Sequence, residues 1–278
     1  MSLLEVQGLN VWYQLAGDAE LHAVRDVSFE LDAGERLGVV GESGCGKSTA
    51  LLALLGLLPP SAQAAGSVVF AGEELLVSDD DVVRRHRWRD IATVFQGTMS
   101  ALNPVKRIAD QIREPMELHR TASGPAADRR SAELLELVGL ASSVGRRYPH
   151  ELSGGMRQRA AIAMALACEP RVLLADEPTT GLDVMVQAQI LELLGGLARD
   201  VGLALVLVTH DLPLVAQVCG RAAVMRAGEI IETGPVDTLY HAPRHAYTRW
   251  LFAATPGVED LDGRLAVPAE PPPPSPPA

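Results

Sequence analysis

The feature that most constrains the fold of this chain is the segment Gly41–Ser48, which reads GESGCGKS and matches the pattern G-x-x-x-x-G-K-[ST]. A short apolar run of strand type, Arg36–Val40, precedes this segment, and Thr49–Leu55 follows it with helical character. Glycines in such a loop let backbone N–H groups turn inward around phosphate oxygens, and the helix N-terminus adds about half a positive charge. Strand, glycine loop and helix in this order predict a phosphate-binding loop.

The same loop predicts which side chains contact a nucleoside triphosphate and its metal ion. The Lys47 ammonium is expected to neutralise β- and γ-phosphate oxygens, and the Ser48 hydroxyl is expected to hold Mg²⁺. A nucleotide and Mg²⁺ are therefore the expected ligands. The predicted nucleotide-binding residues of this segment are Gly41, Glu42, Ser43, Gly44, Cys45, Gly46, Lys47, Ser48 and Thr49.

Two adjacent carboxylates follow a second apolar run, Arg171–Ala175, which suits a buried parallel strand. Asp176 and Glu177 would emerge at the carboxyl edge of the sheet, where ligands bind in open α/β folds. Neighbouring side chains on a strand point to opposite faces, so the two are expected to have different roles. Asp176 is predicted to lie just beyond the direct ligands of Mg²⁺. Glu177 is predicted to orient and polarise the attacking water.

Three further polar residues complete the predicted catalytic set. Gln96 ends the strand-like run Ile91–Phe95, where its amide can touch Mg²⁺ or the attacking water. His210 follows the apolar strand Leu203–Val208, and its imidazole can donate to the γ-phosphate. Asp183 lies one turn beyond the paired carboxylates, where capping a helix and reaching across a dimer interface are compatible roles.

A second set of phosphate-gripping amides is predicted at Leu152–Arg159, which reads LSGGMRQR. Its serine and glycines, Ser153, Gly154 and Gly155, open another helix. One chain cannot easily aim both this turn and the phosphate loop at one nucleotide. The order of these motifs therefore predicts two chains that close over shared ATP.

Together these motifs resemble the ATP-binding cassette of ABC transporters, from about Leu4 to Pro256. Several stretches resemble more narrowly the dipeptide/oligopeptide/nickel importer family, and in that family the first, or D-type, cassette. The resemblance implies a heterodimer with an F-type cassette, two transmembrane permeases and an extracytoplasmic solute-binding protein. The stretches that carry it are Leu55–Pro59, Ala101–Val105, Tyr148–Glu151, Ala163–Cys168, Asp183–Leu191 and Arg244–Arg249.

The resemblance also implies residue roles. Ser153, Gly154 and Gly155 would contact the γ-phosphate of the ATP that the partner cassette holds. Tyr13 stands where such cassettes place an aromatic ring on adenine, and Trp12 is an adjacent competitor. A permease helix would dock near Met99–Asn103.

The cysteines depart from the family pattern. Many peptide-importing relatives carry a cysteine cluster for an iron–sulfur centre near the C-terminus, whereas Cys45, Cys168 and Cys219 match no metal motif. The missing cluster makes an oligopeptide a weaker candidate for the transported solute than nickel or another small solute. Within the phosphate loop, the helix N-terminus and Lys47 predict a lowered pKa for Cys45 and reactivity toward maleimides.

Composition excludes several other classes. A net charge of −11 argues against nucleic acid as the main partner. No apolar run approaches the ~18 residues of a spanning helix, and no basic segment precedes an apolar signal core. The chain is therefore expected at the cytoplasmic face of the inner membrane, in contact with the membrane only through its permeases. Two alternatives stay open: a cassette of an exporter or lipoprotein-release system, and a non-transport ABC ATPase acting on nucleic acid or the ribosome.

The expected fold is an α/β P-loop NTPase with a RecA-like parallel-sheet core, an antiparallel β subdomain and an inserted helical subdomain. Residues 1–96 are expected to form the antiparallel layer, including Ile91–Phe95, and the phosphate-loop part of the core. Residues 97–165 form the helical subdomain, in which Thr121–Arg130 is expected to separate two helices. Residues 166–232 complete the core, and 233–278 form a C-terminal extension ending in a disordered proline-rich tail.

Overall fold

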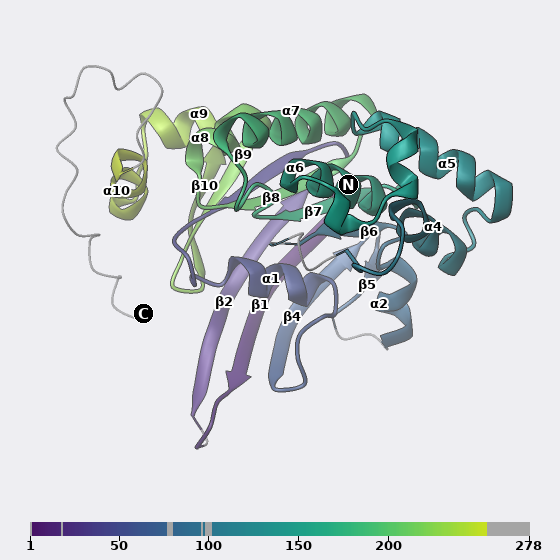
Figure 1. Ribbon diagram of the computed structural model, residues 1–278. Helices are drawn as coiled ribbons and strands as arrows, with labels where there is room; N and C mark the ends of the chain where they lie inside the picture. The colour runs from purple at the N-terminus through teal and green to yellow at the C-terminus, as the bar shows by residue number, and fades with distance from the viewer. Residues whose placement is uncertain (1, 18, 77–79, 96, 98–101, 255–278) are drawn as a thin grey trace. The chain divides into compact units, whose positions relative to one another are not determined.

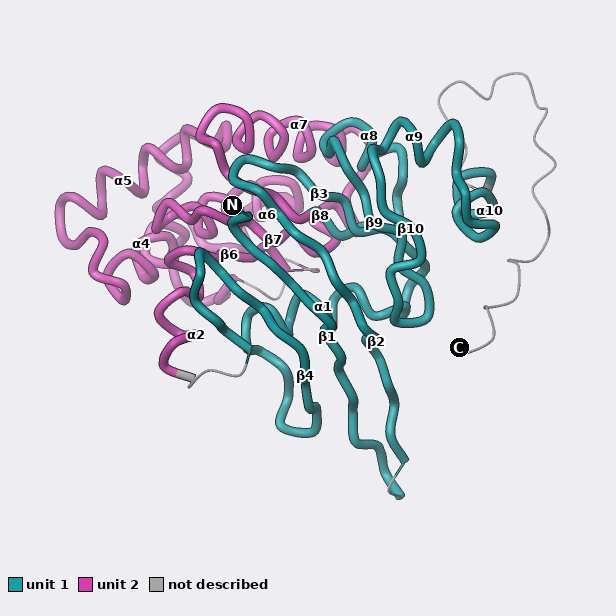
Figure 2. Tube along the Cα trace, turned by 180° about the vertical axis from the view of Figure 1, so that it is seen from behind, with its two compact units in different colours: residues 1–78, 207–278 teal, residues 79–206 magenta. Residues whose placement is uncertain are grey.

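The computed structural model describes residues 2–17, 19–76, 80–95, 97 and 102–254. By contact clustering these residues divide into two compact units, which Figure 2 colours separately. Unit 1 comprises 1–78 and 207–278, and unit 2 comprises 79–206. The predicted four-part division stays a prediction, and the proline-rich tail lies outside the described residues.

Unit 1 contains a four-stranded antiparallel sheet in the order β2-β1-β4-β5 (Figure 1). Leu4 pairs with Leu31 on one side and with Phe70 on the other, and all three side chains are buried. One face of this sheet is therefore part of the core, as alternating apolar residues predict. The strands are β1 (Leu4–Gln14), β2 (Glu20–Leu31), β4 (Ala62–Phe70) and β5 (Glu73–Glu74).

Within unit 1, the phosphate-loop strand β3 (Arg36–Val40) lies in a different sheet from β1 and β2. It runs parallel to β9 (Arg221–Arg226), with Leu37 opposite Arg221 and Val40 opposite Val224. Strand β9 in turn pairs antiparallel with β10 (Glu229–Pro235). The helices of this unit are α1 (Lys47–Leu54), α8 (Leu212–Val218), α9 (Val236–His241) and α10 (Ala246–Ala254).

Unit 2 combines parallel strands with a helical layer. Strand β6 (Ile91–Val94) runs parallel to β7 (Val172–Asp176), and every residue of both strands is buried. Helices α4, α5 and α6 contact one another. Its helical elements are α2 (Asp80–His86), α4 (Ile108–Leu118), α5 (Gly124–Leu137), the 3₁₀ turns Ser142–Arg146 and Pro149–Glu151, α6 (Gly154–Ala165) and α7 (Val184–Asp200). Strand β8 (Ala204–Thr209) contains the division between the units.

Two expectations from the sequence are wrong in detail. Ile91–Val94 lies in the parallel ladder with β7, not in the antiparallel layer, because its buried apolar residues need cover on both faces. The polar stretch expected between two helices is largely helix α5, which begins at Gly124. Its first turn holds a proline, which is favourable there, and Ala127 is fully buried against its neighbours.

Candidate functional site

The phosphate loop has the predicted local structure within unit 1. Strand β3 ends at Val40, and helix α1 begins at Lys47 with Gly46 as its N-cap. Gly41 permits a close approach that no other residue would, since a Cβ there would lie 2.1 Å from the carbonyl oxygen of Met225. The loop therefore rests directly on the backbone of β9 and leads into the N-terminus of α1, where an anion is favoured.

Lys47 is buried inside this loop. Its Nζ donates hydrogen bonds of 2.8 Å to the carbonyl oxygens of Gly41 and Glu42. Only 5% of the residue is exposed, so its charge acts in a setting where water screens it weakly. The loop thus holds a cation beside converging backbone amides, which is the chemistry that a polyphosphate requires.

Cys45 corrects one prediction. Its thiol is buried, and burial raises its pKa, although the nearby Lys47 ammonium acts in the opposite direction. Lys47 Nζ lies 3.7 Å from Cys45 Sγ, yet desolvation outweighs this attraction. The expected lowering of the pKa is therefore wrong, and the expected reactivity toward maleimides no longer follows from it.

The two aromatic candidates near the phosphate loop have different neighbours. The Tyr13 hydroxyl donates to Thr49 Oγ1 at 3.4 Å, which places the ring beside the first turn of α1. Trp12 instead stacks on His22, with the ring centroids 4.7 Å apart and the planes at 17°. One face of the Trp12 ring is therefore already occupied, whereas Tyr13 extends toward the loop.

The paired carboxylates of unit 2 occupy different backbone environments. Asp176 is the last residue of β7 and is 7% exposed. Glu177 leaves the strand with φ of 42°, a left-handed conformation that is unusual for a residue with a side chain. Its Oε2 accepts a hydrogen bond of 2.8 Å from the Thr180 hydroxyl. The two carboxylates therefore stand in different backbone environments, Asp176 at the end of the strand and Glu177 in the turn beyond it.

The Ser-Gly-Gly turn and the Asp183 turn lie against each other in unit 2. Ser153 is the N-cap of α6, and its Oγ accepts from the Met156 N–H at 3.3 Å. Asp183 is the N-cap of α7, and its Oδ1 accepts from the Val186 N–H at 3.0 Å. At Gly155 a Cβ would lie 2.6 Å from Val186 Cγ1, so only glycine permits this packing. The first turns of α6 and α7 are therefore in contact.

The other predicted residues divide between the units. His210 follows β8 directly in unit 1 and is exposed, and the next residue, Asp211, caps helix α8. Gln96 lies outside the described residues. Thr180, which holds Glu177, was not among the predicted site residues; its spacing of three residues from a carboxylate in a turn is the signal that indicates it.

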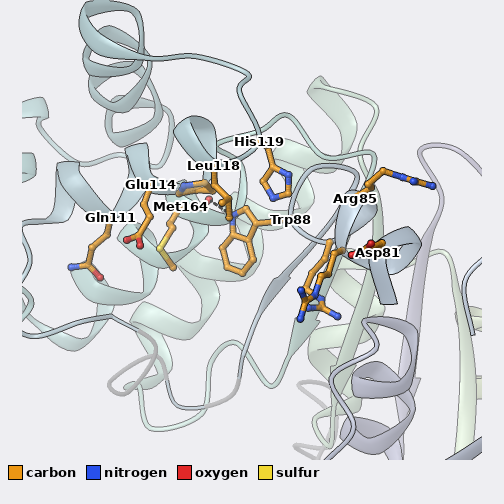
Figure 3. A pocket seen from close by; sticks show the side chains of 11 residues that line it. Asp81, Arg85, Trp88, Gln111, Glu114, Leu118, His119 and Met164 are labelled. Carbon is orange, nitrogen blue, oxygen red and sulfur yellow. Dashed lines mark hydrogen bonds between the residues drawn. The ribbon is translucent and has the colours of Figure 1, made fainter. Parts of the chain in front are cut away.

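A pocket of about 980 Å³ lies wholly within unit 2 (Figure 3). In the figure the Trp88 indole stands in the middle of the group, and its Nε1 donates to the Met164 carbonyl at 3.0 Å. Leu118 at the rim is 76% exposed. Burial, followed by the charge of Arg89, lowers the pKa of His119. The lining residues are Asp81, Arg84, Arg85, Arg87, Trp88, Gln111, Glu114, Pro115, Leu118, His119 and Met164.

Comparison with known proteins identifies the family. A family model described as "ABC transporter" matches residues 24–180, more than half of the chain. The chain belongs to the ABC transporter family. A dimeric ATP-binding cassette, MJ0796, in a post-hydrolysis state with ADP and Pi is 29% identical with a TM-score of 0.75, over 84% of this chain and 98% of that one. The resemblance, the P-loop NTPase fold and the ATPase activity predicted from the sequence are thereby confirmed.

The curated relatives narrow the similarity further. The oligopeptide transport ATP-binding protein OppD of Bacillus subtilis is 45% identical over 97% of this cassette and 77% of the relative. The dipeptide transport protein DppD of the same organism is 45% identical over 98% and 82%. The glutathione import protein GsiA of Salmonella choleraesuis is 44% identical over 94%, although the cassette spans only 43% of that longer relative. Among the described residues, no helix is long and apolar enough to cross a bilayer.

Proposed function

We propose that this cassette is the ATP-hydrolysing subunit of an importer for peptides, nickel or a similar small solute. The observation that carries this proposal is the 45% identity to two ATP-binding proteins, named for oligopeptide and dipeptide transport, along almost the entire cassette. An importer of this kind implies permease subunits in the membrane and a solute-binding protein outside it. The cassette would then work at the cytoplasmic face of the inner membrane.

Unit 1 supplies the residues that hold the nucleotide. Tyr13 stacks on adenine rather than Trp12, because Tyr13 reaches Thr49 while Trp12 is engaged with His22. Lys47 binds phosphate oxygens. The remaining contacts are backbone amides and side chains of Gly41, Glu42, Ser43, Gly44, Cys45, Gly46, Ser48 and Thr49.

The residues proposed for Mg²⁺ fit its chemistry, since a hard cation prefers oxygen ligands. The Ser48 hydroxyl belongs to the first turn of α1, and the Asp176 carboxylate is buried at a strand end, where a cation would offset its charge. Gln96 is the third proposed contact. Bound Mg²⁺ would neutralise charge on the β- and γ-phosphates.

Hydrolysis then depends on Glu177 and His210. The Glu177 carboxylate orients and polarises the water, and its position is held by the Thr180 hydroxyl. His210 is exposed at the end of β8, where an imidazole N–H can donate to the γ-phosphate. Gln96 contacts the same water.

A second cassette completes each nucleotide site in this proposal, and a distinct F-type subunit is the expected partner. Ser153, Gly154, Gly155 and Asp183 of one cassette face the triphosphate held by the other. The N-terminus of α6 supports this role, because its dipole favours an anion and its N-cap Ser153 is uncharged. Charge-assisted hydrogen bonds from both chains make closure depend on ATP, and loss of the γ-phosphate opens the dimer.

We also propose that a cytoplasmic segment of a permease docks in the unit 2 pocket. The pocket combines an indole and the exposed side chain of Leu118 with arginines, which suits an amphipathic helix that carries carboxylates. The docking segment expected at Met99–Asn103 is mostly outside the described residues, and Leu102 is buried and offers no surface. Cysteine crosslinking from Leu118→Cys to permease loops in the intact complex tests this placement, and absence of any crosslink there contradicts it.

Reconstitution tests the function itself. The cassette, its permeases and the binding protein are placed in proteoliposomes, and ATP hydrolysis is measured with di- to pentapeptides or Ni²⁺. Stimulation that needs both the binding protein and one of these solutes supports import. Lys47→Ala should abolish ATP binding, whereas Lys106→Ala, which loses only an exposed pair with Glu114, should retain it. Copurification with nucleic acid or ribosomes, or transport without a binding protein, would contradict the proposal.

A further inference from the structure

The C-terminal helix α10 brings a tyrosine into the core of unit 1. Tyr247 is 0% exposed although it lies 200 residues beyond the phosphate loop in sequence. Its ring lies under the Arg226 guanidinium, whose Cζ is 4.4 Å from the ring centroid, and it stacks on Trp250 at 5.8 Å. These contacts hold the ring in one orientation and thereby set the position of its hydroxyl.

The hydroxyl of Tyr247 lies beside the phosphate loop. Burial, followed by the nearby Glu42, raises the pKa of Tyr247 to about 12, and Cys45 also contributes. The hydroxyl is therefore neutral and can donate a proton to a hydrogen bond. Its oxygen is buried and lies close enough to the side chain and backbone of Glu42 for both to act on its pKa, yet it makes no hydrogen bond of good geometry among the described residues. A buried hydroxyl in this condition carries a desolvation cost that a new hydrogen bond would remove.

The loop is also supported from behind by the residues next to Arg226. Gly41 rests on the Met225 carbonyl, and the Gly228 N–H donates to the Cys45 carbonyl at 2.9 Å. Strand β9 and the turn after it thus contact the loop, and Tyr247 lies beside Glu42 of the same loop. What remains adjustable is the Gly41–Glu42 peptide, whose neighbouring carbonyls are held by Lys47.

A lysine ammonium has three N–H donors, and Lys47 uses two of them on the carbonyls of Gly41 and Glu42. Lys47 can therefore offer a phosphate only one donor unless it releases one of these carbonyls. When its ammonium turns to a phosphate, the carbonyls of Gly41 and Glu42 lose a charged donor, and the peptide between them is free to rotate. A rotated peptide would misdirect the amides that follow it in the loop. Another fixed polar group beside Glu42 would prevent this rotation.

We propose that Tyr247 is a positioning residue whose hydroxyl pairs with Glu42 and holds the Gly41–Glu42 peptide when Lys47 turns to phosphate. The C-terminal extension is thereby part of the nucleotide site. This inference rests on the proposed nucleotide-binding role of the loop. The pose of Tyr247 is set at the start of α10, where the Glu232 carboxylate accepts from the N–H groups of Arg244 and His245 at 2.8 and 3.1 Å.

The test compares Tyr247→Phe with Tyr240→Phe, an exposed tyrosine of α9, in the full-length cassette. Affinity for a fluorescent N-methylanthraniloyl derivative of ATP and the melting temperature without nucleotide are measured for each. Tyr247→Phe should raise Kd about three- to tenfold, the effect of one hydrogen bond. Its melting temperature should be unchanged or higher, because no existing hydrogen bond is lost. Tyr240→Phe should change neither quantity.

Two outcomes would overturn the inference. An unchanged Kd for Tyr247→Phe would show that the Tyr247 hydroxyl has no role in nucleotide binding. A raised Kd accompanied by a lower melting temperature would show that the hydroxyl is merely structural. Lys47→Ala in the same assay separates this failure from failure of the proposed site. If the unmodified cassette binds and Lys47→Ala does not, the nucleotide site stands whatever Tyr247→Phe shows.

Discussion

The Thr180 hydroxyl donates a 2.8 Å hydrogen bond to Oε2 of Glu177, three residues earlier in the chain. Glu177 has φ of 42° at this point, a conformation that costs energy and persists only where surrounding contacts maintain it. Because β7 ends at Asp176, this turn gives Glu177 an orientation that a continuing strand would not allow. The hydrogen bond and the turn together orient the Glu177 carboxylate for its proposed role in positioning the attacking water.

Replacing Glu177 with Gln should lower ATP turnover by about 10²- to 10⁴-fold, because the amide is a poor base while its shape is retained. Binding of ATP should persist. Phosphate release and fluorescent-nucleotide binding by the assembled transporter measure the two effects. Glu192→Gln, an exposed change on α7, is the matched control. Nearly normal turnover in Glu177→Gln would assign the base to another residue.

Thr180→Val should reduce turnover about tenfold with little change in ATP affinity, since only the orientation of the Glu177 carboxylate is lost. Thr180→Ser keeps a hydroxyl at the same position and should restore most of the rate. Steady-state kinetics of the complex separate kcat from KM. Full activity in Thr180→Val, or a loss in Thr180→Ser as large as that in Thr180→Val, would contradict a role of the hydrogen bond.

Removing either of the two helix caps, Ser153 or Asp183, should lower the stability of the cassette. Asp183→Ala removes the acceptor for the Val186 N–H and should lower the free energy of unfolding by about 0.5–2 kcal/mol. Ser153→Ala should act in the same direction on α6. Denaturant titration of the isolated cassette measures both changes. Asp183→Asn retains a capping oxygen, so a loss as large as that of Asp183→Ala would argue against capping.

Cys45 should react slowly with maleimides at pH 7. Burial raises the pKa of its thiol above the ordinary value of 9.0, so the reactive thiolate is scarcer than in a free cysteine. The rate should rise as pH increases through 9.0 and should not level off there. Peptide mass spectrometry after timed labelling distinguishes Cys45 from the other cysteines, with the guanidinium-unfolded chain as reference. Labelling of the folded cassette faster than glutathione at pH 7 would contradict this.

Acid should loosen the start of helix α10. Burial by itself raises the pKa of Glu232, but the nearby Thr248 hydroxyl and the hydrogen bonds from the N–H groups of Arg244 and His245 outweigh it and leave the pKa below 4.5. The stability that this carboxylate contributes is therefore present above pH 4.5 and is lost as pH falls through its lowered value. Hydrogen exchange in α10, corrected for intrinsic rates, should increase in that range. The increase should be absent in Glu232→Gln, which lacks the titrating group.

The local motifs were predictable from the sequence because each is a contiguous run whose chemistry its own residues dictate. The phosphate loop between β3 and α1, the carboxylates at the end of β7 and the caps Ser153 and Asp183 are of this kind. Backbone conformation and helix dipoles act over a few residues, so spacing alone is informative.

Only the tertiary structure decided the features that depend on distant parts of the chain. Ile91–Val94 pairs in parallel with β7, and the Cys45 thiol is buried. Tyr247, near the end of the sequence, lies beside Glu42. Burial and desolvation depend on which segments pack together, and no local pattern contains that information. The charge state of Cys45 and the support behind the phosphate loop are consequences of packing.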